Sequence, residues 1–151
     1  MEKPRNFLIF VTMKKMILLA AAALLSVAVY AQSLSLKVPE TVPEAAREVL
    51  VQRFVQMLQA AGVTVEDSGE PLRIEAKVLD RMETPGSASQ TALSVEIRAY
   101  ILRNGEVLVE NTWPVKGVGS DEADAWLRAA KQILPRSKAA SAFVEELKSK
   151  I

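Results

Sequence analysis

The stretch LSVEIRAYILRNGEVLVENTWPV, residues 93–115, decides the fold, because apolar and polar side chains alternate on both sides of a short polar turn. Such alternation is typical of strands with one buried face. The first half places five apolar side chains in one row: Leu93, Val95, Ile97, Ala99 and Ile101. The pattern predicts a β-hairpin that lies against a core.

Two registers are open to this hairpin. A two-residue turn at Asn104-Gly105 would place Glu110 opposite Ala99, among apolar neighbours. A three-residue loop over 103–105, with Gly105 in the left-handed conformation, avoids this. It pairs Ile101 with Val107, Ala99 with Val109 and Val95 with Trp113. Because a one-residue slip exchanges the two faces, we expect the three-residue loop.

Asn111 and Trp113 then fall on the inner row. A buried amide is costly unless it is hydrogen-bonded, so Asn111 is either a satisfied structural amide or a contact residue. Trp113 is either a core side chain or an aromatic that contacts a partner or glycan. Pro114 has no N–H, which favours an edge position for the second strand of the hairpin.

The sequence pattern of the N-terminal half of the domain predicts a strand, a helix and further strands. Ser33–Val38 alternates, a helix with an apolar stripe follows and stops at Gly62, and the short run 63–67 is β-rich. Strand, helix, strand order favours a right-handed crossover with parallel strands. Leu72–Val78 alternates again. Asp80–Gln90 has the composition of a long loop, and long loops often carry function.

Two helices close the chain, one from Ser120 that ends before Pro135 and one from about Ser137. We expect an α+β fold: a small mixed sheet in β-α-β-β-β-α-α order, with the helices packed on one face. Arg81 and Met82 in the expected loop, together with Asn111 and Trp113, are the predicted contact surface.

The N-terminus has the order of a secretory signal: basic residues, an apolar run over 16–29 and a small residue, Ala31, before Gln32. We expect a signal peptide over 1–31, with a second candidate start at Met13, and a single domain over 32–151. Cleavage after Ala31 places the protein in the periplasm. An uncleaved signal that tethers it to the inner membrane is the alternative.

Composition excludes several kinds of chemistry. Histidine and cysteine are absent from the sequence, so Ser-His and Cys-His nucleophiles, disulfides and a lipid-bearing cysteine cannot form. Without residues 1–31, 15 basic and 17 acidic side chains remain, a net charge of about −2. No basic stripe is present, so nucleic acid and anionic lipid are poor partners. We expect no cofactor, no metal and no catalytic residue.

The motif VKGVGSDEADAW, residues 115–126, is the one glycine-rich stretch that could cradle a phosphate. A dinucleotide fingerprint needs glycine or alanine where Glu122 stands, and a phosphate loop needs Lys-Ser/Thr after its last glycine. Acids in the first helical turn would also repel a phosphate. We expect a structural motif, with glycines that turn the backbone into a helix capped by Ser120 or Asp121. Its members are Lys116, Gly117, Gly119, Ser120 and Glu122.

This motif also carries a resemblance. Lys116-Gly117-Val118-Gly119 with Glu122, Ala129–Ile133 and Phe143–Glu146 resembles a group of uncharacterised exported proteins of Gram-negative bacteria with a KGVG-x-x-E helix start. The element order is distantly similar to the small periplasmic α/β domain of the curli-secretion lipoprotein and of the peptidoglycan-synthase activator lipoprotein. Those families act through protein contacts. The missing lipid-bearing cysteine departs from both.

The resemblance and the composition together predict a non-catalytic periplasmic accessory protein that contacts another envelope protein in envelope assembly or homeostasis. The sequence identifies neither that partner nor the oligomeric state. A small-molecule or glycan-binding module is the alternative, and a carboxylate-dependent hydrolase is a second one.

Overall fold

The computed structural model describes residues 33–86 and 88–151. The predicted signal peptide, with its cleavage between Ala31 and Gln32, lies outside these residues. In the described part the elements follow in the order β1 (Ser33–Lys37), α2 (Glu44–Ala60), β2 (Thr64–Val65), β3 (Glu70–Thr84), β4 (Gln90–Arg103), β5 (Glu106–Gly119), α3 (Glu122–Ala130) and α4 (Lys138–Lys150).

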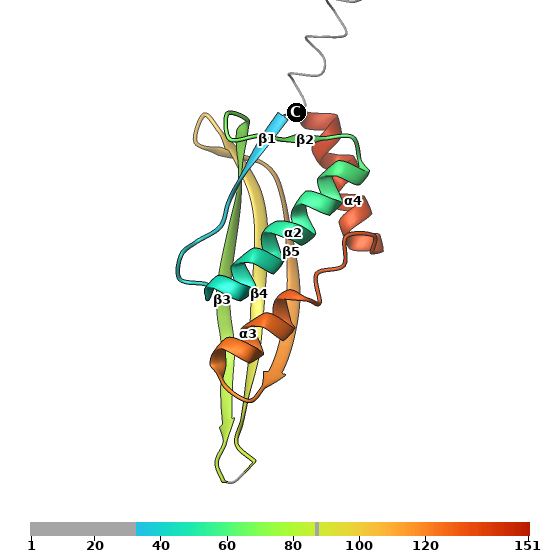
Figure 1. The fold of residues 1–151 in the computed structure, drawn as a ribbon. Helices are drawn as coiled ribbons and strands as arrows, with labels where there is room; N and C mark the ends of the chain where they lie inside the picture. Colours follow the sequence, from blue (N-terminus) through green and yellow to red (C-terminus); the bar gives the residue numbers. More distant parts are fainter. Residues whose placement is uncertain (1–32, 87) are drawn as a thin grey trace, which may run out of the picture. The chain divides into compact units, whose positions relative to one another are not determined.

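The five strands form one mixed sheet in the order β2-β1-β3-β4-β5. β1 is parallel to β2 and to β3, whereas β3, β4 and β5 are antiparallel. All three helices lie on one face of this sheet (Figure 1). The predicted α+β class, the mixed sheet and the parallel β1–β2 crossover pair are confirmed. The observed element order, β-α-β-β-β-β-α-α, contains one strand more than the predicted order β-α-β-β-β-α-α.

The β4–β5 hairpin has a two-residue turn, so the predicted three-residue loop is wrong. Asn104 and Gly105 both have positive φ, 56° and 79°, as a type I′ turn requires. A bulge after Ile101 then shifts the register by one residue. Ile101 lies opposite Val109, Ala99 opposite Asn111 and Ile97 opposite Trp113. The bulge restores the predicted faces although every partner differs.

The predicted loop Asp80–Gln90 is also wrong for most of its length. β3 continues to Thr84, which pairs with Gln90 at the start of β4, so among the described residues of the predicted loop only 85, 86, 88 and 89 lie outside the strands. The register slips between Val78 and Asp80, which puts the later residues out of phase with the alternation of Leu72–Val78. Residues 77–84 are exposed on both faces. Neither face therefore selects apolar side chains, and the segment resembles a loop in composition.

The core lies between the sheet and the three helices. Trp113 of β5 is part of this core, with its ring edge-on to Phe54 of α2 and to Phe143 of α4, each at 5.3 Å between centroids. Only 7% of Trp113 is exposed. Its indole N–H has no hydrogen-bond partner in the described part of the chain. The side chain therefore contributes through packing, in agreement with the inner position predicted for it.

Gly117 and Gly119 lie at the C-terminal end of β5, where α3 packs on the strand. Neither has a positive φ, so the predicted role of turning the backbone is wrong. A Cβ on Gly117 would overlap the carbonyl oxygen of Ala125, and a Cβ on Gly119 would lie 2.5 Å from the Ala125 nitrogen. The two glycines are needed because helix backbone approaches strand backbone directly.

Candidate functional site

The four residues of the predicted contact surface do not form one surface. Arg81 lies opposite the buried Leu93 and therefore on the helix side of the sheet, whereas Met82 lies opposite Ala92 on the open side. Trp113 is in the core. Asn111 is partly buried on the same inner row. Of the four, Met82 is the most exposed large apolar side chain, with 64% of it accessible.

Arg81 connects β3 to the start of α3. Its Nη1 lies 2.6 Å from Glu122 Oε1, and its Nη2 lies 2.9 Å from Glu83 Oε2. All three side chains are about half exposed, so the pairs add little stability. The structure thus brings together Arg81 from the predicted contact surface and Glu122 from the predicted structural motif. This contact was not predicted, because Arg81 was expected to lie in a loop.

The start of α3 is held by its own acids. Asp121 is the N-cap and accepts a hydrogen bond from the Asp124 N–H at 2.8 Å, as predicted for Ser120 or Asp121. Asp124 in turn accepts from the Ser120 N–H at 3.0 Å and from Arg128 Nε at 3.2 Å. The hydrogen bond from Ser120 is the main cause of a lowered pKa of Asp124. These carboxylates occupy the donors that a phosphate would need.

The open face of the sheet carries a charged network across three strands. Arg98 of β4 lies 2.7 Å from Glu110 of β5 and 3.4 Å from Glu75 of β3, and its guanidinium lies over the Tyr100 ring, 4.1 Å from the centroid. The Tyr100 hydroxyl donates to Glu75 at 2.6 Å. This hydrogen bond raises the pKa of Tyr100, and the bond to Glu110 raises the pKa of Arg98. Sequence reasoning missed the network because it depends on the exact register.

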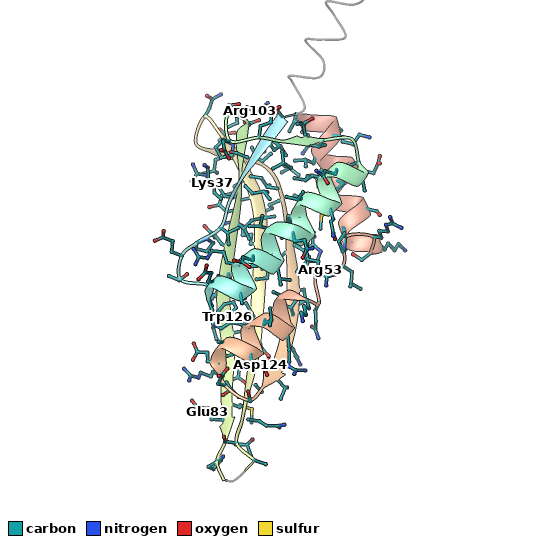
Figure 2. The ribbon with its side chains drawn as sticks, viewed as in Figure 1. Lys37, Arg53, Glu83, Arg103, Asp124 and Trp126 are labelled. Atoms are coloured by element: carbon teal, nitrogen blue, oxygen red, sulfur yellow. The ribbon has the colours of Figure 1, made fainter. Side chains whose placement is uncertain are left out.

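The end of the sheet furthest from the β4–β5 turn exposes apolar side chains. We call Val78–Thr84 and Gln90–Ser94 the distal hairpin; it extends beyond α3 in Figure 1, and Figure 2 shows Glu83 on it. Met82, Ala92 and Val118 lie side by side in register on the open face. We call these three residues the apolar row. Val118 is 50% exposed, and the nearby Leu79 is 53% exposed.

The two long sheet edges differ in what covers them. On β5, Pro114 offers no N–H, the Lys116 N–H donates to Gln132 Oε1 at 2.9 Å, and Lys150 Nζ donates to the Leu108 carbonyl at 3.3 Å. β5 is the last strand in the sheet order, which confirms the edge position predicted from Pro114. On β3, β1 pairs only with Glu70–Arg73. Beyond Arg73, no other strand of the described part pairs with that edge.

A groove of about 810 Å³ lies elsewhere, between the C-terminal half of α2 and the segment that joins α3 to α4. Its lining is Gln56, Gln59, Ala60, Leu134, Pro135, Arg136 and Ser137. Leu134 is 55% exposed. None of the predicted site residues lines this groove.

Two further observations concern the described residues as a whole. No three or more acidic side chains come together there in an arrangement that could hold a metal ion. None of the helices in residues 33–86 and 88–151 has the length and apolar character that a membrane crossing requires.

Comparison with known proteins gives distant likenesses in fold. No protein-family model and no curated protein sequence matches the chain. A minor lipoprotein from Acinetobacter baumannii is similar in structure, with a TM-score of 0.46, 17% identity and coverage of 74% of this chain and 92% of that one. A candidate lipoprotein from Caulobacter crescentus gives a TM-score of 0.43, 15% identity and coverage of 82% and 96%. A hypothetical protein from Chlamydia trachomatis gives a TM-score of 0.31, 12% identity and coverage of 78% of this chain and 93% of that one.

Proposed function

We propose that the protein is a non-catalytic periplasmic accessory protein that binds another envelope protein through the apolar row. The observation that carries the proposal is the position of Met82, Ala92 and Val118 in adjacent strands, with Met82 64% and Val118 50% exposed. A contiguous exposed apolar patch is costly in water and is characteristic of contact sites. The periplasmic location in this proposal rests on the predicted export signal.

The neighbourhood of the apolar row supports binding of a largely apolar partner surface. Charged side chains lie at its border, where Lys116 and Asp80 occupy the next cross-strand positions. An apolar centre with a polar rim is the usual anatomy of a protein interface. The absence of histidine and cysteine from the sequence removes the commonest nucleophile–base pairs and supports a non-catalytic role.

Co-purification from envelope extracts tests the proposal. Val118→Lys places a charge in the apolar row, whereas Val51→Lys places one at another exposed valine, on α2. We expect the same partner with the wild type and with Val51→Lys, and its loss with Val118→Lys. Equal recovery of that partner with both variants would contradict the proposal.

A second candidate function rests on the groove beside α2. Its volume of about 810 Å³ is within the range of small-molecule sites, and the amides of Gln56 and Gln59 could orient a polar ligand. Thermal-shift measurements with sugars and cell-wall fragments separate the two functions. A specific shift that Gln56→Ala abolishes favours ligand binding, whereas no shift with any compound favours the protein-contact function.

A further inference from the structure

At the open edge of β3, alternate residues direct their backbone N–H and C=O groups away from β4. In an antiparallel ladder, successive residues direct their N–H and C=O groups alternately to the two sides. The Lys116 N–H of β5 points away from β4, and Lys116 pairs with Ser94, which pairs with Asp80, so the backbone groups of Asp80 face β4. The next residue, Arg81, has the opposite phase, and its N–H donates to the Asp80 carboxylate at 2.9 Å. Arg81, and Glu83 in the same phase, therefore direct their backbone groups to the side of β3 on which no strand of the described part lies.

We propose that two copies of this chain associate edge to edge, with the two β3 strands antiparallel and Met82 on the two-fold axis. The inference is independent of the proposed function, because it concerns the sheet edge and a second copy of the same chain. It requires only that Asp80–Thr84 keep the extended conformation that the structure shows.

Charge selects this register among the symmetric ones. With Met82 on the axis, Arg81 lies opposite Glu83 of the second copy, and Glu83 lies opposite its Arg81. Opposite charges directly across two strands are favourable, and like charges are unfavourable. An axis at Arg81 would place two guanidinium groups together, and an axis at Glu83 would place two carboxylates together. Neither of those registers is self-complementary.

The other side chains of the segment also fit the axis at Met82. On the open face the two Met82 side chains meet, and Thr84 lies opposite Asp80 of the second copy. The Asp80 carboxylate caps the Arg81 N–H in the single chain. When that N–H bonds instead to the Glu83 carbonyl of the second copy, the carboxylate becomes available to the Thr84 hydroxyl across the axis.

The association closes at two copies. The β5 edge is protected by Pro114, Gln132 and Lys150, and β2 at the opposite end of the sheet has two residues. A two-fold contact uses the same patch on both subunits and leaves none to extend a filament. Pairing also joins the two apolar rows, so that Val118, Ala92 and Met82 continue into the same residues of the second copy.

An engineered cysteine tests the position of the axis. The protein contains no cysteine, so Met82→Cys introduces the only thiol. In the proposed register the two Met82 positions form a non-hydrogen-bonded pair with Cα atoms about 4.5 Å apart, which a disulfide can span. We expect Met82→Cys, purified from cells that express the full chain, to form a disulfide-linked dimer on mild oxidation. Val118→Cys, also exposed on the open face but far from the axis, is the control and should form no disulfide-linked dimer.

Charge reversal tests the register without a covalent bond. Glu83→Arg places an arginine opposite Arg81 of the other copy at both symmetry-related positions. We expect the dimer dissociation constant to rise by about tenfold. The double variant Arg81→Glu/Glu83→Arg restores the pairs and should recover association. Glu106→Arg, an exposed charge change on the protected β5 strand, should have no effect.

Sedimentation over a wide concentration range gives the outcome. A dimer that Glu83→Arg weakens, and that the double variant recovers, supports the proposal. A monomer at the highest soluble concentration, or a dimer that neither Glu83→Arg nor oxidation of Met82→Cys distinguishes from the controls, overturns it. The co-purification result with Val118→Lys does not depend on whether the chain forms this dimer. Failure of the dimer proposal and failure of the proposed function are therefore distinguishable.

Discussion

At the scale of single residues, Gly117 shows the most direct link between sequence and packing. A methyl group at this position would overlap the Ala125 carbonyl and lie 2.6 Å from the Ala129 nitrogen. Gly117→Ala must push α3 away from β5, and overpacking of this kind costs about 1–3 kcal/mol. We expect a lower urea midpoint, measured by tryptophan fluorescence, with an unchanged slope. Val118→Ala, between the two glycines but exposed, should change stability by less than about 0.5 kcal/mol.

Asp124 makes a pH-dependent contribution to stability. Because its pKa in the folded chain is lowered, its contribution is present above the unfolded value of about 4 and is lost as the pH falls through the folded value. Asp124→Asn keeps the side-chain shape and removes the charge. We expect the difference in Tm between the wild type and Asp124→Asn to be largest at neutral pH and to shrink as the pH approaches the folded value. A difference that stays constant with pH would contradict this assignment.

At the scale of elements, the protected β5 edge gives a prediction about Gln132. Its side chain accepts the Lys116 N–H, which would otherwise face solvent at the sheet edge. Gln132→Ala should speed hydrogen exchange at the Lys116 amide by about fivefold, the equivalent of ~1 kcal/mol for one hydrogen bond. NMR-detected exchange measures this directly. Gln59→Ala removes another exposed glutamine, on α2, and should leave the Lys116 amide unchanged.

The same elements show what the sequence could predict. Leu93 to Ile101 alternates because one face of β4 is buried, so the strand and its inner row were predictable. The bulge after Ile101 leaves no mark in that pattern, and the partners were predicted wrongly for this reason. β3 beyond Val78 has no buried face, so its extension to Thr84 could not be read from polarity. The contact of Arg81 with Glu122 required both the strand and the packing of α3.

At the scale of the whole molecule, the proposed periplasmic function requires export. The predicted signal peptide ends at Ala31, and the described domain begins at Ser33. We expect the protein in the periplasmic fraction with Gln32 as its first residue, determined by N-terminal sequencing. A mature chain that begins elsewhere, or one that stays with the inner membrane, would replace cleavage by the uncleaved tether.

The central claim is that the apolar row is the surface through which the protein acts. Photocrosslinking in living cells tests it most directly, with a photoreactive residue at Val118 and, as the control, at Val51 on α2; both side chains are exposed. We expect a discrete adduct with another envelope protein from position 118 and none from position 51. The same adducts from both positions, or none from position 118 when the protein is at its native level, would contradict it.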